Sequence, residues 1–356
     1  MPVTGELLAL FRSVGSEVSR LLSEYRRVEV EGGEWVPVGG SLGGVYIGVD
    51  SSRQSELFRF FFIFAVQGVA VVYDASRGVI SNVSDADVGY VELAGSGKFG
   101  FSSRNRDALI SSSSRNLEVS LAHEALSRSK SADLILMDGS YASFTVPVLI
   151  SPKVYERFKE LEKLVDRLHE GWAQRIRMLG SLSKSSRIAF ISKSVTKTHL
   201  TSEENPRIKA TVDGRKTVIP DFMAANLIAA REGRKPGFLW YDNPYFEIRS
   251  GTIDMAKREG ITMEKWYTLT YILLHPAGRL YQATMPGKLT KGEVEQIVKT
   301  LLKVSPEGYP QPLSIPHHTS RLTRRDFKSI IALTIPQTET GREPLEQVVW
   351  GKPGGP

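Results

Sequence analysis

The chain has 356 residues, of which 41% are hydrophobic and 24% are charged, as in soluble globular proteins. At this length it can form one large domain or two ordinary ones. It contains no cysteine, which excludes disulfides, zinc–thiolate sites and cysteine nucleophiles. The formal net charge of +7 favours a polyanionic partner such as nucleic acid, although solubility alone also accounts for a basic surface.

The N-terminal residues predict an amphipathic helix over residues 4–27. Apolar side chains recur there at helical spacing and charges occur throughout, so the segment does not have the pattern of a signal peptide. No stretch reaches the roughly 18 uninterrupted apolar residues of a membrane-spanning helix. We therefore expect a cytoplasmic protein with no membrane partner. The lack of cysteine fits a reducing compartment and also a thermophile.

The next part of the chain predicts strand, strand, strand, helix and strand in that order. The expected ranges are 45–49, 58–66, 69–73, 115–129 and 133–137. Gln67-Gly68 separates the second and third strands, which predicts a hairpin. The Ser- and Asn-rich stretch over 101–115 predicts a loop.

The remaining chain predicts a mixture of helices and strands. A long charged helix over 152–180 is expected to form an arm or a bracing helix, with a short coiled-coil contact as a further alternative. Further strands are expected at 188–191, 238–240, 268–274 and 280–283, and helices at 290–304 and 323–333. No linker or repeat divides the sequence, so we expect one domain over 1–356 with a core at about 40–350.

Two predicted strands end in an acid. Asp50 follows VYIGV and Asp138 follows LILM, and a serine or glycine comes next in both cases. Turn formation or helix capping explains a single aspartate at such a position. Burial of an unpaired carboxylate is costly, however, and parallel strands would bring both acids to one sheet edge, where α/β proteins bind ligands.

The helix expected over 115–129 carries a third acid within its apolar face. With Leu117 at the origin of a helical wheel of roughly 100° per residue, Glu118 falls near the centre of the apolar arc and Glu124 falls beside it. A carboxylate in that position needs a partner, such as a metal ion. A helix that begins two residues later is the alternative, because Glu118 would then be a first-turn acid stabilised by the helix dipole.

These acids predict a particular kind of metal site. Asp50, Glu118 and Asp138 offer oxygen donors only, which suits Mg²⁺ or Mn²⁺ rather than zinc. Two ions about 4 Å apart would activate water and stabilise the leaving oxygen during phosphodiester cleavage.

Prolines and histidines occur together near the C-terminus. Pro310, Pro312 and Pro316 are expected to prevent a helix until after Pro316, which would occupy the first turn of a helix beginning near His317. His317 could ligate a metal or shuttle a proton, although a lone histidine is more often structural. His318 is the weaker alternative.

Two further features of this segment favour nucleic acid. Tyr309 could bond a phosphate or stack on a base. Arg321, Arg324, Arg325 and Lys328 form a basic helix start, which is either a solvated face or a set of phosphate contacts.

Four motifs together resemble the NurA nucleases of archaea and some bacteria. They are GVDSS, R-x-x-E from Arg115 to Glu118, LILMDGSY and GYPQPLSIPHH. The resemblance covers most of the chain and implies an α/β, RNase H-like mixed central sheet flanked by helices, with a long helical arm and additional C-terminal elements. It implies that Asp50, Glu118 and Asp138 bind metal. Tyr309 and His317 would complete the active site, with His317 also a ligand, although Pro316 stands where that family's pattern would have a small helix former.

The same resemblance implies cofactors and partners. It implies Mn²⁺, with Mg²⁺ as the alternative, and two ions. It implies single-stranded DNA endonuclease activity and 5′-to-3′ exonuclease activity on single- and double-stranded DNA. A homodimer that works with a HerA-type hexameric ATPase in DNA end resection for recombinational repair is also implied. Lys193, Arg321, Arg324 and Arg325 are the expected DNA contacts.

Two other functions are open on sequence grounds. A DNA-binding scaffold subunit could have the same fold and basic surface without catalysis. Another RNase H-like nuclease, acting on RNA or on DNA junctions, could also share this core, because a fold does not determine a substrate.

Overall fold

The computed structural model describes residues 14–17, 19, 27–40, 42–58, 60–93, 101–151, 154, 159–193, 197–204 and 206–334. The helix predicted over residues 4–27 lies mostly outside the described residues. None of the helices in this described part is long and apolar enough to cross a membrane.

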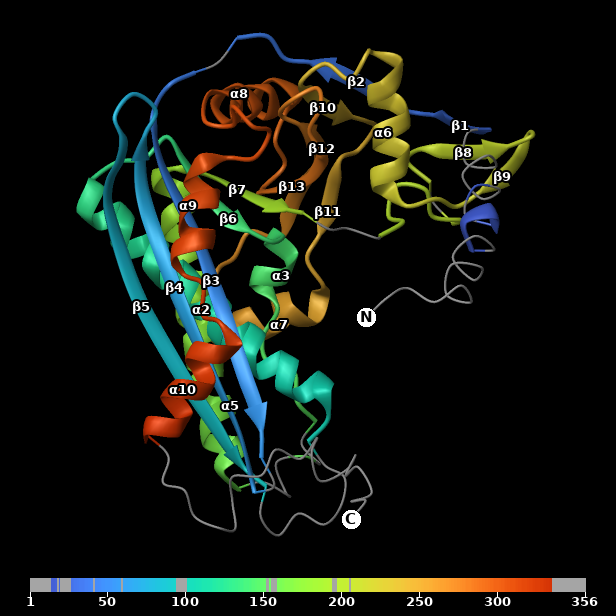
Figure 1. Cartoon of the computed structure of the whole chain (residues 1–356). Helices are drawn as coiled ribbons and strands as arrows, with labels where there is room; N and C mark the ends of the chain where they lie inside the picture. Colours follow the sequence, from blue (N-terminus) through green and yellow to red (C-terminus); the bar gives the residue numbers. More distant parts are fainter. Residues whose placement is uncertain are drawn as a thin grey trace, which may run out of the picture.

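A large mixed sheet forms the centre of the protein (Figure 1), in the order β2-β10-β12-β13-β7-β6-β3-β4-β5. Its strands are β2 (Glu34–Pro37), β3 (Val45–Leu57), β4 (Phe61–Asp74), β5 (Gly78–Glu92), β6 (Leu134–Asp138), β7 (Arg187–Ser192), β10 (Gly237–Trp240), β12 (Trp266–Leu273) and β13 (Leu280–Pro286), with β11 (Tyr245–Glu247) paired to β12. A smaller sheet contains β1 (Val28–Glu31), β8 (Lys209–Val212) and β9 (Arg215–Thr217).

Five neighbouring strands, β5-β4-β3-β6-β7, form an RNase H-like core. β4 is antiparallel to both of its neighbours, whereas β6 and β7 run parallel to β3. Helices α2 (Ser103–Ser129) and α5 (Lys159–Ser185) cover one face, and α8 (Lys291–Lys303), α9 (Gln311–Thr319) and α10 (Arg324–Thr334) lie over the other (Figure 1). Further helices of the described residues are α3 (Tyr141–Thr145), α6 (Asp221–Arg231) and α7 (Ser250–Arg258). The predicted mixed α/β sheet flanked by helices is confirmed.

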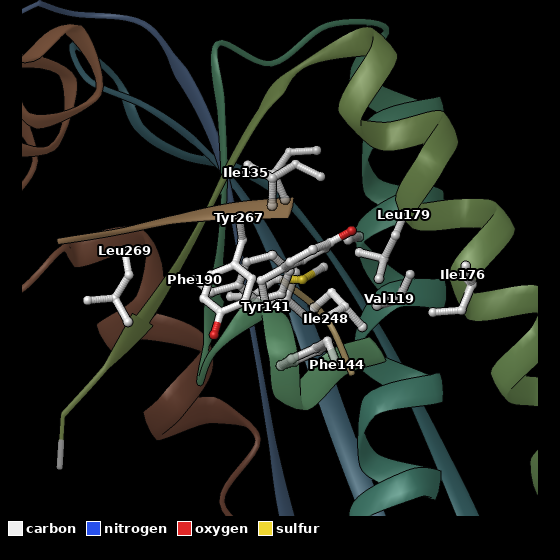
Figure 2. Close-up of a cluster of buried hydrophobic side chains, with 14 of the residues drawn as sticks. Val119, Ile135, Tyr141, Phe144, Ile176, Leu179, Phe190, Ile248, Tyr267 and Leu269 are labelled. Atoms are coloured by element: carbon white, nitrogen blue, oxygen red, sulfur yellow. The ribbon is translucent and has the colours of Figure 1, made fainter. Parts of the chain in front are cut away.

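Alternating side chains of the central strands face two separate cores. Ile47, Val49 and Ile135 belong to the core on the α2 and α5 side. Figure 2 shows side chains from α2, α3, α5 and the strands meeting in this cluster. Tyr46 and Leu134 belong to the second core, on the α8 side. Both faces of β3 are therefore buried, which explains its continuous hydrophobic start.

The predicted hairpin turn at Gln67-Gly68 is wrong, because β4 runs unbroken through both residues. A Cβ atom on Gly68 would lie 2.7 Å from Leu121 Cδ1 of α2. The glycine therefore allows a close approach between helix and sheet and does not mark a turn. The order strand, strand, strand, helix, strand still holds, because β5 supplies the third strand.

The predicted loop over 101–115 is also wrong, because α2 begins at Ser103. Serine is a moderate helix former, but Ser112, Ser113 and Ser114 are buried against the sheet. Ser113 Oγ donates to Asp87 Oδ2 of β5. Tertiary contacts of these small side chains override their weak local preference.

The long charged helix is a brace along α2. Trp172 of α5 is fully buried, and its Nε1 donates to the Thr145 carbonyl oxygen at 2.8 Å. Arg175, also fully buried, donates to Asn116 Oδ1 of α2 at 2.8 Å and to the Val146 carbonyl oxygen. These contacts hold α2 against the rest of the protein, as the bracing alternative requires.

The helix predicted to begin near His317 instead begins at Gln311. Pro312 occupies the first turn, where a missing N–H costs nothing, and Pro316 lies inside the helix. The Pro312 carbonyl therefore receives no bond from residue 316 and packs against Gly48 of β3, where a Cβ would lie 1.6 Å from its oxygen. The prolines shape a helix that fits closely on the sheet.

Candidate metal centre

Asp50 lies where the neighbouring strand of the sheet ends. β3 pairs with β6 from Tyr46 to Val49 and with β4 along its whole length. Asp50 is only 6% exposed. Its Oδ1 accepts from the Ser51 N–H at 2.8 Å, and its Oδ2 lies 2.5 Å from His317 Nδ1. Burial and the Asp138 charge raise the pKa of Asp50, although the bond to His317 opposes this shift.

Asp138 ends β6, one step beyond the Val49–Met137 pair of the two parallel strands. Gly139 follows at a φ of +123°, which turns the chain away from the sheet. Lys193, directly after β7, places its Nζ 3.1 Å from Asp138 Oδ2. The expectation that both acids reach one sheet edge is therefore met.

Asp50, Asp138 and His317 form a group with the geometry of a metal site. Each offers one ligand atom, and these atoms all lie within 4.8 Å of one another. Ligand atoms that surround an ion at about 2.0–2.6 Å have separations of this size. Of the two histidines, His317 belongs to this group, and its ring lies 5.6 Å from the His318 ring, centre to centre.

Tyr309 lies just before α9, beside the same acids. Its ring lies 5.4 Å from the Tyr281 ring, and Lys193 Nζ is 4.5 Å from its centre. Burial and the charges of Asp138 and Asp50 raise its pKa, so the hydroxyl stays protonated. This hydroxyl is buried and has no hydrogen-bond partner in the part of the chain that the structure describes. An unsatisfied donor beside carboxylates fits a site that receives a further polar group.

Glu118 approaches the site from the α2 face of the sheet. It is 5% exposed, and its Oε1 accepts from Ser51 Oγ and from Ser114 Oγ, the latter at 3.2 Å. Because α2 begins at Ser103, the alternative of a first-turn acid is wrong. Burial raises the pKa of Glu118 to about 8, and the charges of Asp50 and Asp138 contribute, against the serine hydrogen bonds.

The three acids therefore converge with one difference from the prediction. Besides burial, the charges of Asp50 and Asp138 raise the pKa of Glu118, so the three acids lie near one another. Glu118 does not belong, however, to the group whose ligand atoms all lie within 4.8 Å of one another. Crowded carboxylates whose pKa values rise are relieved by a bound divalent cation, which favours their charged forms. The residues present fit such an ion in charge, donor type and spacing.

The predicted basic contacts near α10 are exposed, and one of them lies near an acid outside the metal centre. Arg324 Nη2 is 3.7 Å from Glu56 Oε1 of β3. Glu56 is six residues beyond Asp50, which corresponds to roughly 20 Å along a strand. Arg321 and Arg325 are exposed beside Arg324. Arg324 is therefore directed to an acid outside the metal centre, whereas Lys193 contacts Asp138 within it.

Sequence reasoning missed the serines that hold Glu118. Ser51 follows Asp50 directly, so the alternation of a strand points it to the opposite face, toward α2. Ser114 precedes Glu118 by one helical turn. Both relations could have been found from spacing once β3 and α2 were placed side by side.

Comparisons with known proteins find one matching family model and several solved structures of similar fold. A sequence model of the NurA domain matches residues 44–322. The NurA nuclease from Sulfolobus solfataricus is 18% identical, with 93% of this chain and 96% of that chain covered at a TM-score of 0.65. A NurA structure with manganese is 13% identical, with coverage of 91% and 99% and a TM-score of 0.60. A NurA structure bound to dAMP and manganese is 13% identical, with coverage of 95% and 97% and a TM-score of 0.57. Among curated proteins, none matches this sequence.

Proposed function

Because the chain belongs to the NurA family of nucleases, we propose that it is a metal-dependent DNA nuclease whose divalent cation is held by Asp50, Asp138 and His317. The close approach of these three side chains is the observation that carries the proposal. Manganese is the favoured ion, with Mg²⁺ as the alternative, because two structures of similar fold contain manganese. Glu118 would complete the donor set with Asp50 for a second ion.

The bound metal would supply an activated water and stabilise the departing 3′ oxygen. Side chains of the protein would orient the ligands and bind the phosphate. Asp50 orients the His317 ring through Nδ1. The Tyr309 hydroxyl is a free donor that would bond a phosphate oxygen. Lys193 would contact the same phosphate, because a cation bound at Asp138 would replace the Lys193 ammonium as the partner of that carboxylate.

DNA is the proposed substrate, cut within single strands and from 5′ ends of single and double strands. The net charge of +7 supports attraction of a polyanion, and a structure of similar fold binds dAMP. We further propose a homodimer that acts with a HerA-type hexameric ATPase in end resection for recombinational repair, on the basis of family membership. Sedimentation equilibrium should then give twice the chain mass of 39.5 kDa, and co-sedimentation with such an ATPase should be observed.

A cleavage assay with a matched pair of variants tests the nuclease proposal. Wild-type protein should cut a labelled single-stranded oligonucleotide with millimolar Mn²⁺. Asp50→Asn should lose more than about 100-fold in rate, because even outer-shell changes at metal sites cost 10–100-fold. Asp85→Asn makes the same chemical change at an exposed position of β5 and should cut normally.

Asp50→Asn should still bind DNA in EDTA. A wild-type protein that binds DNA but cuts nothing with Mn²⁺ or Mg²⁺ contradicts the proposal and favours a scaffold subunit. Preferential cleavage of RNA or of DNA junctions would favour another RNase H-like nuclease.

A further inference from the structure

The β3 strand extends beyond the metal centre along a free edge. Ser51–Leu57 continue β3 after Asp50, whereas β6 ends at Asp138. β4 pairs with this extension on one side, and no described strand pairs with it on the other. Backbone donors and acceptors beside the acids are therefore not used by the sheet there.

Arg53 lies on the same face of this extension as Ser51. Side chains two residues apart share a strand face, so Arg53 lies about 6.6 Å farther from the site than Ser51. Its Nη1 donates to Ser111 Oγ of α2 at 2.8 Å, and its side chain is exposed. This contact places a guanidinium between the edge of β3 and the first half of α2.

Arg115 lies on α2 close to Arg53, one turn before Glu118. It is partly buried, and burial together with the Arg53 charge lowers its pKa, while Glu118 opposes the shift. Neither Arg53 nor Arg115 forms an ion pair with a carboxylate of the described residues. Within the described part of the chain, two neighbouring guanidinium groups, neither of them in an ion pair and only Arg115 near a carboxylate, form a place where an anion is favoured.

We propose that Arg53 and Arg115 bind the DNA phosphate next to the one that is cleaved and so set the position of the strand at the metal centre. This inference rests on the proposed function, because it takes the anion to be a phosphate of the substrate. Arginine suits the task, since its planar fork binds phosphate oxygens in pairs. The alternative is that Arg115 only balances the charge of Glu118 and contacts no ligand.

Binding measurements in EDTA test this inference without cleavage. Fluorescence anisotropy with a labelled single-stranded oligonucleotide would compare wild type with Arg53→Ala, Arg115→Lys and the double variant Arg53→Ala/Arg115→Ala over a range of salt concentrations. Arg128→Ala is the matched control, because Arg128 lies at the far end of α2, pairs with Glu124 and carries the same charge.

We expect the double variant to bind about tenfold more weakly, with a slope of log K against log salt that is smaller by about 0.7, the value for one phosphate contact on a single strand. Arg53→Ala should lose part of this affinity, and Arg115→Lys should also bind more weakly because it keeps the charge but loses the fork. Arg128→Ala should match wild type within about twofold.

Equal affinity and slope for Arg53→Ala and Arg128→Ala would overturn the inference. Arg53 is exposed, so its variant tests binding even if the Arg115 variants fail to fold. The binding measurement and the cleavage assay can fail independently of each other. Protein that never cuts but shows the Arg53 effect contradicts only the nuclease, and protein that cuts without this effect contradicts only the phosphate contact.

Discussion

Glu118 shows how far hydroxyl groups of the protein can stabilise a buried acid. Two serine hydroxyls donate to its carboxylate, yet burial still raises its pKa to about 8. Neutral hydroxyl donors therefore compensate for only part of the cost of burying the charge. Under the proposed function, a divalent cation nearby would supply the missing compensation.

Substitution of Glu118 should therefore affect catalysis far more than substitution of an exposed acid on the same helix. We expect Glu118→Gln to reduce Mn²⁺-dependent cleavage by about 100-fold or more, because it removes a charge that faces the metal centre. Glu124→Gln, six residues later and exposed, should cleave within about twofold of wild type. Initial rates on a labelled oligonucleotide measure both, and equal rates for the two variants would show that Glu118 is only structural.

Asp221 is another buried acid, and its hydrogen-bond partners lie outside the candidate metal centre. Its carboxylate accepts from the backbone N–H groups of His199 and Leu200, and it is fully buried at the start of α6. Burial raises its pKa to about 6, although these hydrogen bonds oppose the shift. This acid fixes the loop over 199–201 onto α6.

The raised pKa of Asp221 predicts a pH dependence of stability. Below about pH 4 the acid is protonated in both the folded and the unfolded protein. Between about pH 4 and 6 the unfolded chain loses this proton while the folded protein retains it, so the free energy of unfolding falls as pH rises. The free energy of unfolding of wild type minus that of Asp221→Asn should therefore decrease from pH 4 to 6 and stay constant above. Urea unfolding at a series of pH values measures this difference. A difference that rises over the same interval would contradict the assigned direction.

At the scale of elements, the position of α9 depends on one glycine of the central strand. The Pro312 carbonyl packs against Gly48, and His317 is carried to Asp50 by the same helix. Replacement of Gly48 by alanine would force α9 away from β3, since the added carbon would overlap the carbonyl.

Gly48→Ala should therefore destabilise the protein by about 1–3 kcal/mol or more and should also reduce cleavage. Gly180→Ala is the control, because Gly180 lies inside α5 with no atom within 4 Å of the added carbon. It should stabilise the protein by about 0.5–1 kcal/mol. Chemical denaturation measures both changes. A Gly48→Ala protein as stable and as active as wild type would show that α9 is not held by this contact.

Elements with a clear hydrophobic period could be predicted, and those held by tertiary contacts could not. β6 and β7 have continuous apolar runs, β12 is mostly apolar, and all three appear near their expected ranges. β5 was not predicted, because its side chains are mostly exposed and polar residues such as Asp85 and Asp87 interrupt the apolar ones. Its pairing with β4 defines it as a strand, and that pairing cannot be read from composition.

At the scale of the whole molecule, the candidate site combines segments that lie far apart in the sequence. The two strand-end acids could be placed together because parallel strands share an edge. The helix start at Ser103, the entry of α9 from the opposite face and the Arg53–Ser111 contact depend on packing between elements. Local spacing carries no information on such distances, so the approach of Asp50 to Asp138 could be predicted and the packing of the groups around them could not.

Metal binding should stabilise the whole protein, since the unfolded chain cannot bring the ligands together. At a concentration 100 times the dissociation constant, a ligand that binds only the native state adds about 2.7 kcal/mol. We expect millimolar Mn²⁺ to raise the Tm of wild type and of Asp85→Asn by a few degrees and to leave that of Asp50→Asn/Asp138→Asn unchanged. Differential scanning calorimetry measures the shift. An equal rise in the double variant would place the ion elsewhere.

A crystal structure determined in millimolar Mn²⁺, with anomalous data that identify the ion, tests the central claim most directly. The account predicts a manganese peak within about 2.0–2.6 Å of Asp50, Asp138 and His317, with Lys193 released from Asp138. Manganese bound elsewhere, or no peak between these three side chains, would contradict it.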